Sequence, residues 1–188
     1  MKTDIRVRYT KSIIRESFFA CLNKKGALKD VTVTEVCELA EINRTTFYKY
    51  YKDCFDLVEQ IESELTQEFR CVFTNTGNAF SRDFAEAIVN LLNKYDKLIE
   101  SYADRSIEGG LIEKLVSISH ELCIDIWKEH LPKGKEKEIE MLFSMASSTF
   151  FQLVISEHGK YSNEEVLRFM YKLLGNVTEQ YRDDAYTA

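Results

Sequence analysis

The sequence predicts an all-α protein of about nine helices. Its 188 residues include only one proline and seven glycines, while 45% are hydrophobic, and this composition favours long helices over strands joined by tight turns. Apolar residues recur at intervals of three and four along most of the chain, which is the period of helices with one buried face. We expect a three-helix domain at residues 1–52 and a larger helical domain at 53–188.

The first helix is predicted at residues 9–23. Lys24 and Lys25 place positive charge at its carboxyl end, and Gly26 is suited to the left-handed residue that closes a helix. One face carries the polar residues Lys11, Arg15 and Glu16, and the opposite, apolar face carries Ile14, Phe18, Cys21 and Leu22.

Two further helices and a short turn are predicted within residues 32–51, TVTEVCELAEINRTTFYKYY. Thr32 or Thr34 can cap the first of them, and Glu35 lies in its first turn. The inward residues of this first helix are expected to be Val36, Leu39 and Ala40. Residues 41–43 form the turn with Ile42 inward, and Phe47 and Tyr51 continue an apolar seam on the second helix.

The outward face of this second helix carries groups that suit DNA. Arginine can donate two hydrogen bonds to a guanine edge, threonine methyls can contact thymine, and lysine and tyrosine can hold phosphates. The alternative is a solvated surface helix. The predicted DNA-binding residues are Lys11, Thr34, Asn43, Arg44, Thr45, Thr46, Tyr48, Lys49, Tyr50 and Lys52.

The charge distribution supports this interpretation. Residues 1–52 hold 11 Lys and Arg against 6 Asp and Glu, a net charge of +5, whereas the rest of the chain carries −11. Salt confines each region's field to roughly 8–10 Å. A basic region can therefore attract phosphate within a chain whose net charge is −6.

The segment from Tyr9 to Leu57 resembles the DNA-binding domain of the TetR family of bacterial transcriptional regulators. The resemblance covers about a quarter of the chain and implies a homodimer on a near-palindromic operator, a small effector in the second domain, and a repressor. The phrases RTTFYKYYKD and FFQLVISEHG resemble a subgroup that includes regulators of dihydroxyacetone kinase genes. The matching residues are Ala40, Ile42, Asn43, Arg44, Thr46, Phe47, Tyr48, Tyr51 and Leu57.

Two positions depart from the family pattern. Glu41 stands where glycine is usual, so the turn must close without a positive φ or with strain. Cys54 stands where a phosphate-binding lysine is common, although Asp53 and Asp56 can still cap and charge the start of the next helix. We expect Cys54 to be the most exposed of the five thiols; its position at a helix start raises the question of redox sensing.

Later helices are predicted at 55–73, 84–92, 111–127, 139–154 and 166–177. The last two are strongly apolar and are expected to form a four-helix bundle with a second copy; the alternative is that they close their own domain. The predicted interface residues are Ile139, Phe143, Phe150, Leu153, Met170, Leu173 and Val177.

The helices between these ends could enclose an effector pocket, because ligand sites between helices are mostly apolar. The alternatives are a plain core, or a second domain that docks on a partner protein without any small ligand. The predicted pocket residues are Phe69, Phe73, Phe84, Tyr102, His120, Cys123 and Trp127.

No catalytic residues, metal site or cofactor are expected. The chain lacks a G-x-S-x-G motif, a glycine-rich phosphate loop and an H-x-x-x-H pair, and its histidines are His120, His130 and His158. Five cysteines without a C-x-x-C suit neither a disulfide framework nor zinc. With no apolar leader or membrane span, a cytoplasmic protein without a membrane partner is expected.

Overall fold

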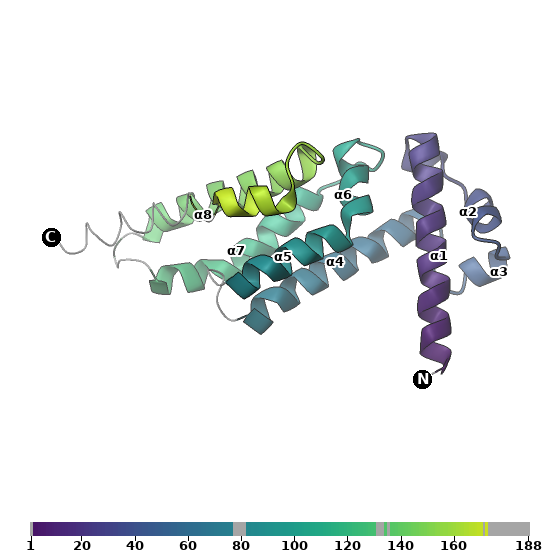
Figure 1. The fold of residues 1–188 in the computed structure, drawn as a ribbon, viewed down its shortest axis with the longest axis horizontal. Helices are drawn as coiled ribbons and strands as arrows, with labels where there is room; N and C mark the ends of the chain where they lie inside the picture. Colours follow the sequence, from purple (N-terminus) through teal and green to yellow (C-terminus); the bar gives the residue numbers. More distant parts are fainter. Residues whose placement is uncertain (1, 77–81, 131–133, 135, 171, 173–188) are drawn as a thin grey trace. The chain divides into compact units, whose positions relative to one another are not determined.

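The computed structural model describes residues 2–76, 82–130, 134, 136–170 and 172, and these are mainly helical (Figure 1). This confirms the predicted all-α fold for the part described. A further helix occupies residues 163–170. The labelled helices are α1 (Lys2–Lys25), α2 (Val33–Leu39), α3 (Arg44–Phe47), α4 (Cys54–Thr76), α5 (Arg82–Lys94), α6 (Asp96–Ala103), α7 (Leu111–His130) and α8 (Glu136–Phe151).

The chain divides into two compact units. Unit 1 comprises Met1–Glu64 with Asp104–Gly109, and unit 2 comprises Leu65–Ala103 with Gly110–Ala188. Unit 1 therefore contains the start of α4 and a distant six-residue segment in addition to the predicted domain at 1–52. In that segment Ile107 is buried, and the Ser106 carbonyl accepts a hydrogen bond of 2.8 Å from the Leu28 amide.

Unit 1 is built on α1, which packs against α2, and α2 packs against α3. Ile14, Phe18 and Leu22 of α1 are fully buried, as the spacing predicts. In α2, Val36 and Ala40 are buried, but Leu39 is 55% exposed, so its predicted inward position is wrong. Cys37 is buried instead; at 100° per residue Cys37 and Leu39 flank the Val36–Ala40 face symmetrically, so helix spacing alone does not decide which of the two is covered.

α1 begins at Lys2, seven residues before the predicted start at Tyr9, whereas the carboxyl end of α1 and the starts of α2 and α4 follow the predicted signals. Gly26 closes α1 with φ 74°, and its amide donates to the Leu22 carbonyl at 2.8 Å. Thr32 and Glu35 form a capping box at the start of α2. The Asp56 amide donates to Oδ1 of Asp53 at 2.8 Å, which caps α4.

In unit 2, α7 packs against α8, and α6 packs against a short π-helical segment, η2 (Gln152–Ser156). The predicted helix at 139–154 therefore ends early as an α-helix and continues in the wider π form. Aromatic rings fill part of the interior: Phe69 lies 5.0 Å from Phe73 and 5.7 Å from Phe151, measured between ring centroids.

Candidate nucleic-acid interface

A four-residue turn, residues 40–43, joins α2 to α3. The Ala40 amide donates to the Val36 carbonyl at 2.9 Å, and the Ile42 amide donates to the Cys37 carbonyl at 3.0 Å. Between them Glu41 has φ 53°. Glu41 is thus left-handed where a residue with a Cβ is disfavoured, so this turn closes with local strain.

Asn43 fixes the start of α3. Its Oδ1 accepts hydrogen bonds from the Thr46 amide at 2.8 Å and from the Thr46 hydroxyl at 2.9 Å. Asn43 is therefore the N-cap of α3, and the Thr46 hydroxyl is engaged within the helix. Asn43 and Thr46, both predicted to contact DNA, therefore hydrogen-bond to each other.

Aromatic residues anchor the inner side of α3 and of the turn that follows it. The predicted second helix is shorter than expected, because it ends at Phe47 and Tyr51 lies beyond it. Phe47 is fully buried and Tyr51 is 2% exposed, and their ring centroids lie 5.6 Å apart. Tyr48 packs its ring edge-on to Phe47 while remaining 56% exposed. The buried pair fixes which side of α3 faces outward, and Tyr48 lies at the border of that side.

The outward side of α3 and of the turn after it carries predicted DNA-contacting groups. Arg44, Thr45 and Lys49 are exposed, while Thr46 is half-buried. The Arg44 guanidinium donates a hydrogen bond to the Thr34 hydroxyl at the start of α2. Arg44 and Thr34, ten residues apart, therefore meet on one surface of unit 1.

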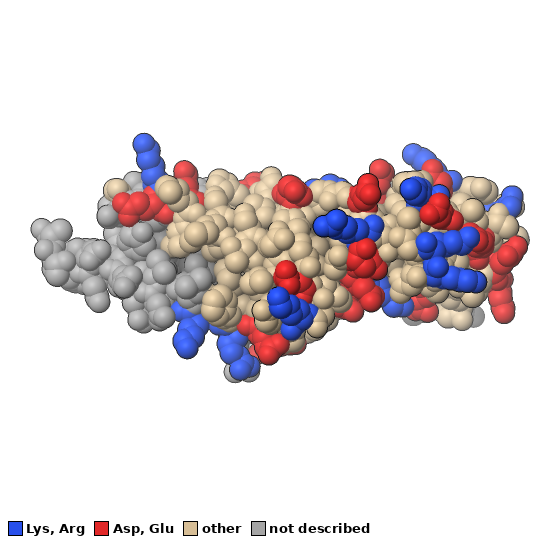
Figure 2. Space-filling view, turned by 90° about the horizontal axis from the view of Figure 1, so that it is seen from above, with Lys and Arg blue, Asp and Glu red and all other residues tan. Residues whose placement is uncertain are grey.

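The remaining predicted contacts also belong to unit 1. Lys52 is exposed, and Tyr50 is half-buried. The Lys11 ammonium lies 5.7 Å from the centroid of the Tyr51 ring, so α1 contributes a cation next to the end of the recognition segment, residues 44–52. Figure 2 shows Lys and Arg side chains interspersed with Asp and Glu on the face of unit 1 that is in view.

An ion pair connects the end of α1 to the start of α2. Lys25 Nζ lies 2.6 Å from Oε1 of Glu35, whose Oε2 accepts from the Thr32 amide and hydroxyl. The hydrogen bond from Lys25, followed by those from Thr32, lowers the pKa of Glu35 to about 2. This carboxylate is therefore charged at neutral pH and holds the amino end of α2.

Cys54 is not the exposed thiol that its position predicts. It is 3% exposed, and burial, followed by the charge of Asp53, raises its pKa to about 12. A protonated, buried thiol is a poor nucleophile, which argues against redox sensing at Cys54. Cys71 on α4 is exposed.

Three of the predicted pocket residues, Phe69, Phe73 and Phe84, pack together as aromatic rings. The rings of Phe73 and Phe84 lie 4.8 Å apart, and Phe69 packs on Phe73. Tyr102 is half-buried, whereas His120 is exposed with its ring 6.0 Å from Phe143. The side chains of Cys123 and Trp127 lie outside the described residues.

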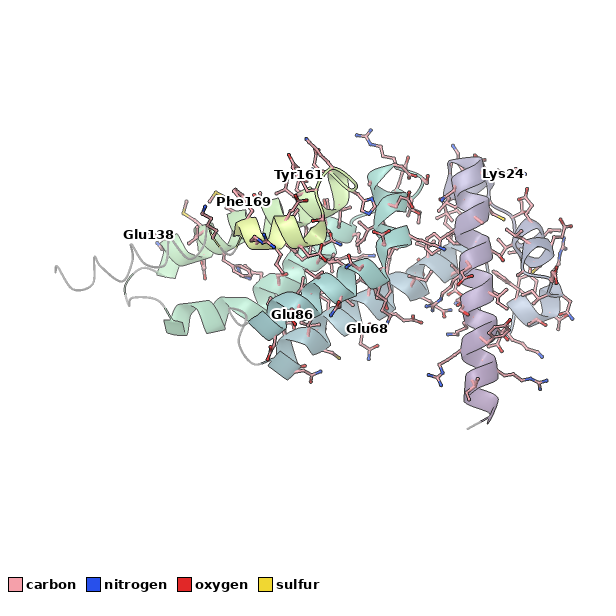
Figure 3. All side chains as sticks on the ribbon, in the orientation of Figure 1. Lys24, Glu68, Glu86, Glu138, Tyr161 and Phe169 are labelled. Carbon is pink, nitrogen blue, oxygen red and sulfur yellow. The ribbon has the colours of Figure 1, made fainter. Side chains whose placement is uncertain are left out.

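Several predicted interface residues lie inside unit 2. Phe143, Phe150 and Met170 are buried and Leu153 is half-buried, while the Ile139 side chain, Leu173 and Val177 lie outside the described residues. The same helices expose other apolar residues: Met141 by 72%, Met145 by 61% and Phe169 by 55%. Figure 3 shows Phe169 projecting outward, and Figure 2 shows a broad uncharged surface over this part of unit 2.

Sequence reasoning missed a polar stripe on α4. Asp56, Gln60 and Glu64 recur every four residues and hydrogen-bond to the end of the recognition segment and to Arg15. Their four-residue spacing within the apolar pattern of α4 was the available signal, because residues at this spacing share one face of a helix.

Comparison with protein-family models and comparison with curated proteins each find no match to this chain. Among the described residues, none of the helices combines the length and apolar character that crossing a membrane requires.

Proposed function

We propose that this protein is a DNA-binding transcriptional regulator, a repressor that binds a near-palindromic operator as a homodimer. The observation that carries the proposal is the two-sidedness of the recognition segment, residues 44–52, which comprises α3 and the turn after it. Phe47 and Tyr51 anchor its inner side, while Arg44, Thr45 and Lys49 stand exposed on its outer side. The resemblance of residues 9–57 to the TetR family supports the same function.

The outer side offers both kinds of contact that sequence-specific binding requires. Arg44 and Thr45 begin the recognition helix, whose amino-terminal residues meet base edges in helix-turn-helix proteins. Lys49, Lys52 and Lys11 are placed for phosphates, which repeat along DNA and carry no sequence information. Arg44 must exchange its bond to Thr34 for one to a base, so Thr34 orients it before DNA arrives.

The test compares Arg44→Ala with Lys49→Ala on DNA duplexes selected from a random library. Arg44→Ala should cost about 1–3 kcal/mol on the preferred sequence and relax preference at one base pair. Lys49→Ala should weaken all sequences alike and reduce the salt dependence of binding. An unchanged sequence preference for the Arg44 variant would reassign that residue to the backbone.

A homodimer is the assembly that suits this function. Two recognition helices roughly 34–36 Å apart would match successive major grooves, and obligate interfaces bury upwards of roughly 2,000 Å². The exposed Met141, Met145 and Phe169 are apolar residues that a second copy would cover. Met141→Lys with Met145→Lys should yield monomers in sedimentation, and a monomeric parent protein at micromolar concentration would contradict the proposal.

Two modes of control fit unit 2. One is a small effector that releases the protein from DNA; the other is a partner protein that docks on unit 2 without a small ligand. The direct packing of Phe69 on Phe73 and of Phe73 on Phe84 favours the partner. A metabolite that raises the melting temperature of the parent protein and dissociates it from DNA would favour the effector.

A further inference from the structure

We propose that the stripe of Asp56, Gln60 and Glu64 on α4, together with Arg15, positions the recognition segment and thereby sets the ratio of specific to non-specific DNA affinity. This inference rests on the proposed function and adds a set of positioning residues that need not touch DNA. The three stripe residues lie at intervals of four, so they share one face of α4.

Each stripe residue holds a different residue at the end of the recognition segment. Oδ2 of Asp56 accepts from the Lys52 amide at 2.8 Å. Nε2 of Gln60 donates to the Tyr50 carbonyl at 3.0 Å and also to Oδ2 of Asp56 at 3.0 Å. Asp56 and Gln60 therefore hydrogen-bond to each other and to the main chain on both sides of Tyr51.

Glu64 completes the stripe through Arg15. The Arg15 guanidinium donates Nη2 to Oε1 of Glu64 at 2.6 Å and Nε to the Tyr51 hydroxyl at 3.2 Å. The Arg15 side chain is 24% exposed and the Glu64 side chain 39%, so the pair is partly shielded from water. Hydrogen bonds thus hold three successive residues: Tyr50 through its carbonyl, Tyr51 through its hydroxyl and Lys52 through its amide.

The recognition segment needs this external support because its own helix is short. α3 spans only Arg44–Phe47, and the chain beyond it follows a turn up to α4. Asn43 fixes the beginning of α3, whereas its end has only a few turn hydrogen bonds, such as that from the Tyr51 amide to the Phe47 carbonyl at 3.1 Å. The stripe fixes the end, so the angle of α3 within unit 1 is held from both sides.

Specific and non-specific binding depend on this angle to different degrees. Base recognition requires side chains to meet base edges in register, whereas non-specific binding needs only positive charge near phosphates. Loosening the end of the recognition segment should therefore reduce operator affinity and leave non-specific affinity and its salt dependence unchanged.

The test uses Gln60→Met and Glu64→Met in the full chain, because methionine keeps the side-chain length and suits a helix. Glu64→Gln, which retains an acceptor for Arg15, serves as the conservative variant. The matched control is Glu121→Met, which breaks another arginine–glutamate pair, the bidentate contact at 2.9 and 2.8 Å between Arg70 of α4 and Glu121 of α7 in unit 2.

On duplexes selected by the parent protein, each stripe methionine variant should lose about tenfold in affinity, the change that 1.4 kcal/mol produces. Binding to a random-sequence duplex should stay the same, Glu64→Gln should recover part of the loss, and Glu121→Met should bind like the parent. Equal losses on selected and random duplexes would overturn the inference, as would full affinity of the methionine variants.

Hydrogen exchange without DNA separates this inference from the proposed function. The stripe methionine variants should speed amide exchange in residues 44–52 and leave the core of α1 unchanged. Faster exchange throughout unit 1 would show a general loss of stability and overturn the positioning role. If the parent protein selects no duplex at all, the proposed function fails, and hydrogen exchange alone decides whether the stripe holds the segment.

Discussion

Glu41 offers a direct test of the turn between α2 and α3. Its φ of 53° places a residue with a Cβ in the left-handed region. That conformation costs roughly 1–2 kcal/mol for an L-residue other than glycine. Glycine avoids this cost but loses about 0.5–1 kcal/mol through the greater freedom of its unfolded chain. Glu41→Gly should therefore be more stable than Glu41→Ala by about 0.5–1 kcal/mol.

The comparison with alanine isolates the backbone. Both substitutions remove the same exposed carboxylate, and only glycine relieves the strain. Amide exchange in residues 33–47, followed by mass spectrometry, reports the opening of this part of unit 1. A gain of 1 kcal/mol corresponds to about fivefold slower exchange. Equal exchange in the two variants would refute the left-handed strain at this turn.

Three further outcomes follow from the geometry of the described residues. Asn43→Ala should lower the free energy of unfolding by about 1 kcal/mol, whereas Asn43→Ser should lower it by much less, since serine also caps helices. Equal stability of the alanine variant and the parent would contradict the cap. The pKa of Glu35 is lowered from 4.5 to about 2 in the folded protein, so its stabilising effect is present above pH 4.5 and is lost as the pH falls toward 2. Urea unfolding of Glu35→Gln should accordingly show a deficit at neutral pH that vanishes near pH 2, and a deficit independent of pH would argue against the ion pair with Lys25. Iodoacetamide at pH 8 should alkylate Cys71 in the folded protein and spare Cys54, as peptide mass spectrometry would show; equal modification of the two would contradict the burial of Cys54.

Helix ends and buried positions in unit 1 could be predicted from the sequence where they depend on local chemistry. Gly26 and Asp53 are residues whose backbone or side-chain chemistry suits one position at a helix end, and both occupy it. The burial of Phe47 and Tyr51 follows from their spacing of four. Such features depend on neighbours within one helical turn, which is why spacing alone predicts them.

Features that depend on residues far apart in the sequence could not be predicted from it. The exposure of Leu39 follows from how α2 is rotated against its neighbours, and the burial of Cys54 from what packs around the start of α4. The hydrogen bond from Leu28 to Ser106 joins residues 78 positions apart. Helix periodicity gives the apolar side of each helix but not which partner covers it, so Phe143 and Met141 on α8 could not be assigned to the interior and the surface.

The most direct test of DNA recognition by residues 44–52 is selection of DNA from a random duplex library by the purified full-length protein. Recognition by a homodimer predicts enrichment of a near-palindromic sequence whose half-sites lie about one helical turn, roughly 10 base pairs, apart or a multiple of that distance. It also predicts that affinity for the enriched duplex falls by a factor of roughly 10³ or more between 50 and 200 mM salt, as expected when several phosphates are neutralised. No enrichment, together with no measurable binding to any duplex at 50 mM salt, would contradict the proposal that residues 44–52 recognise DNA.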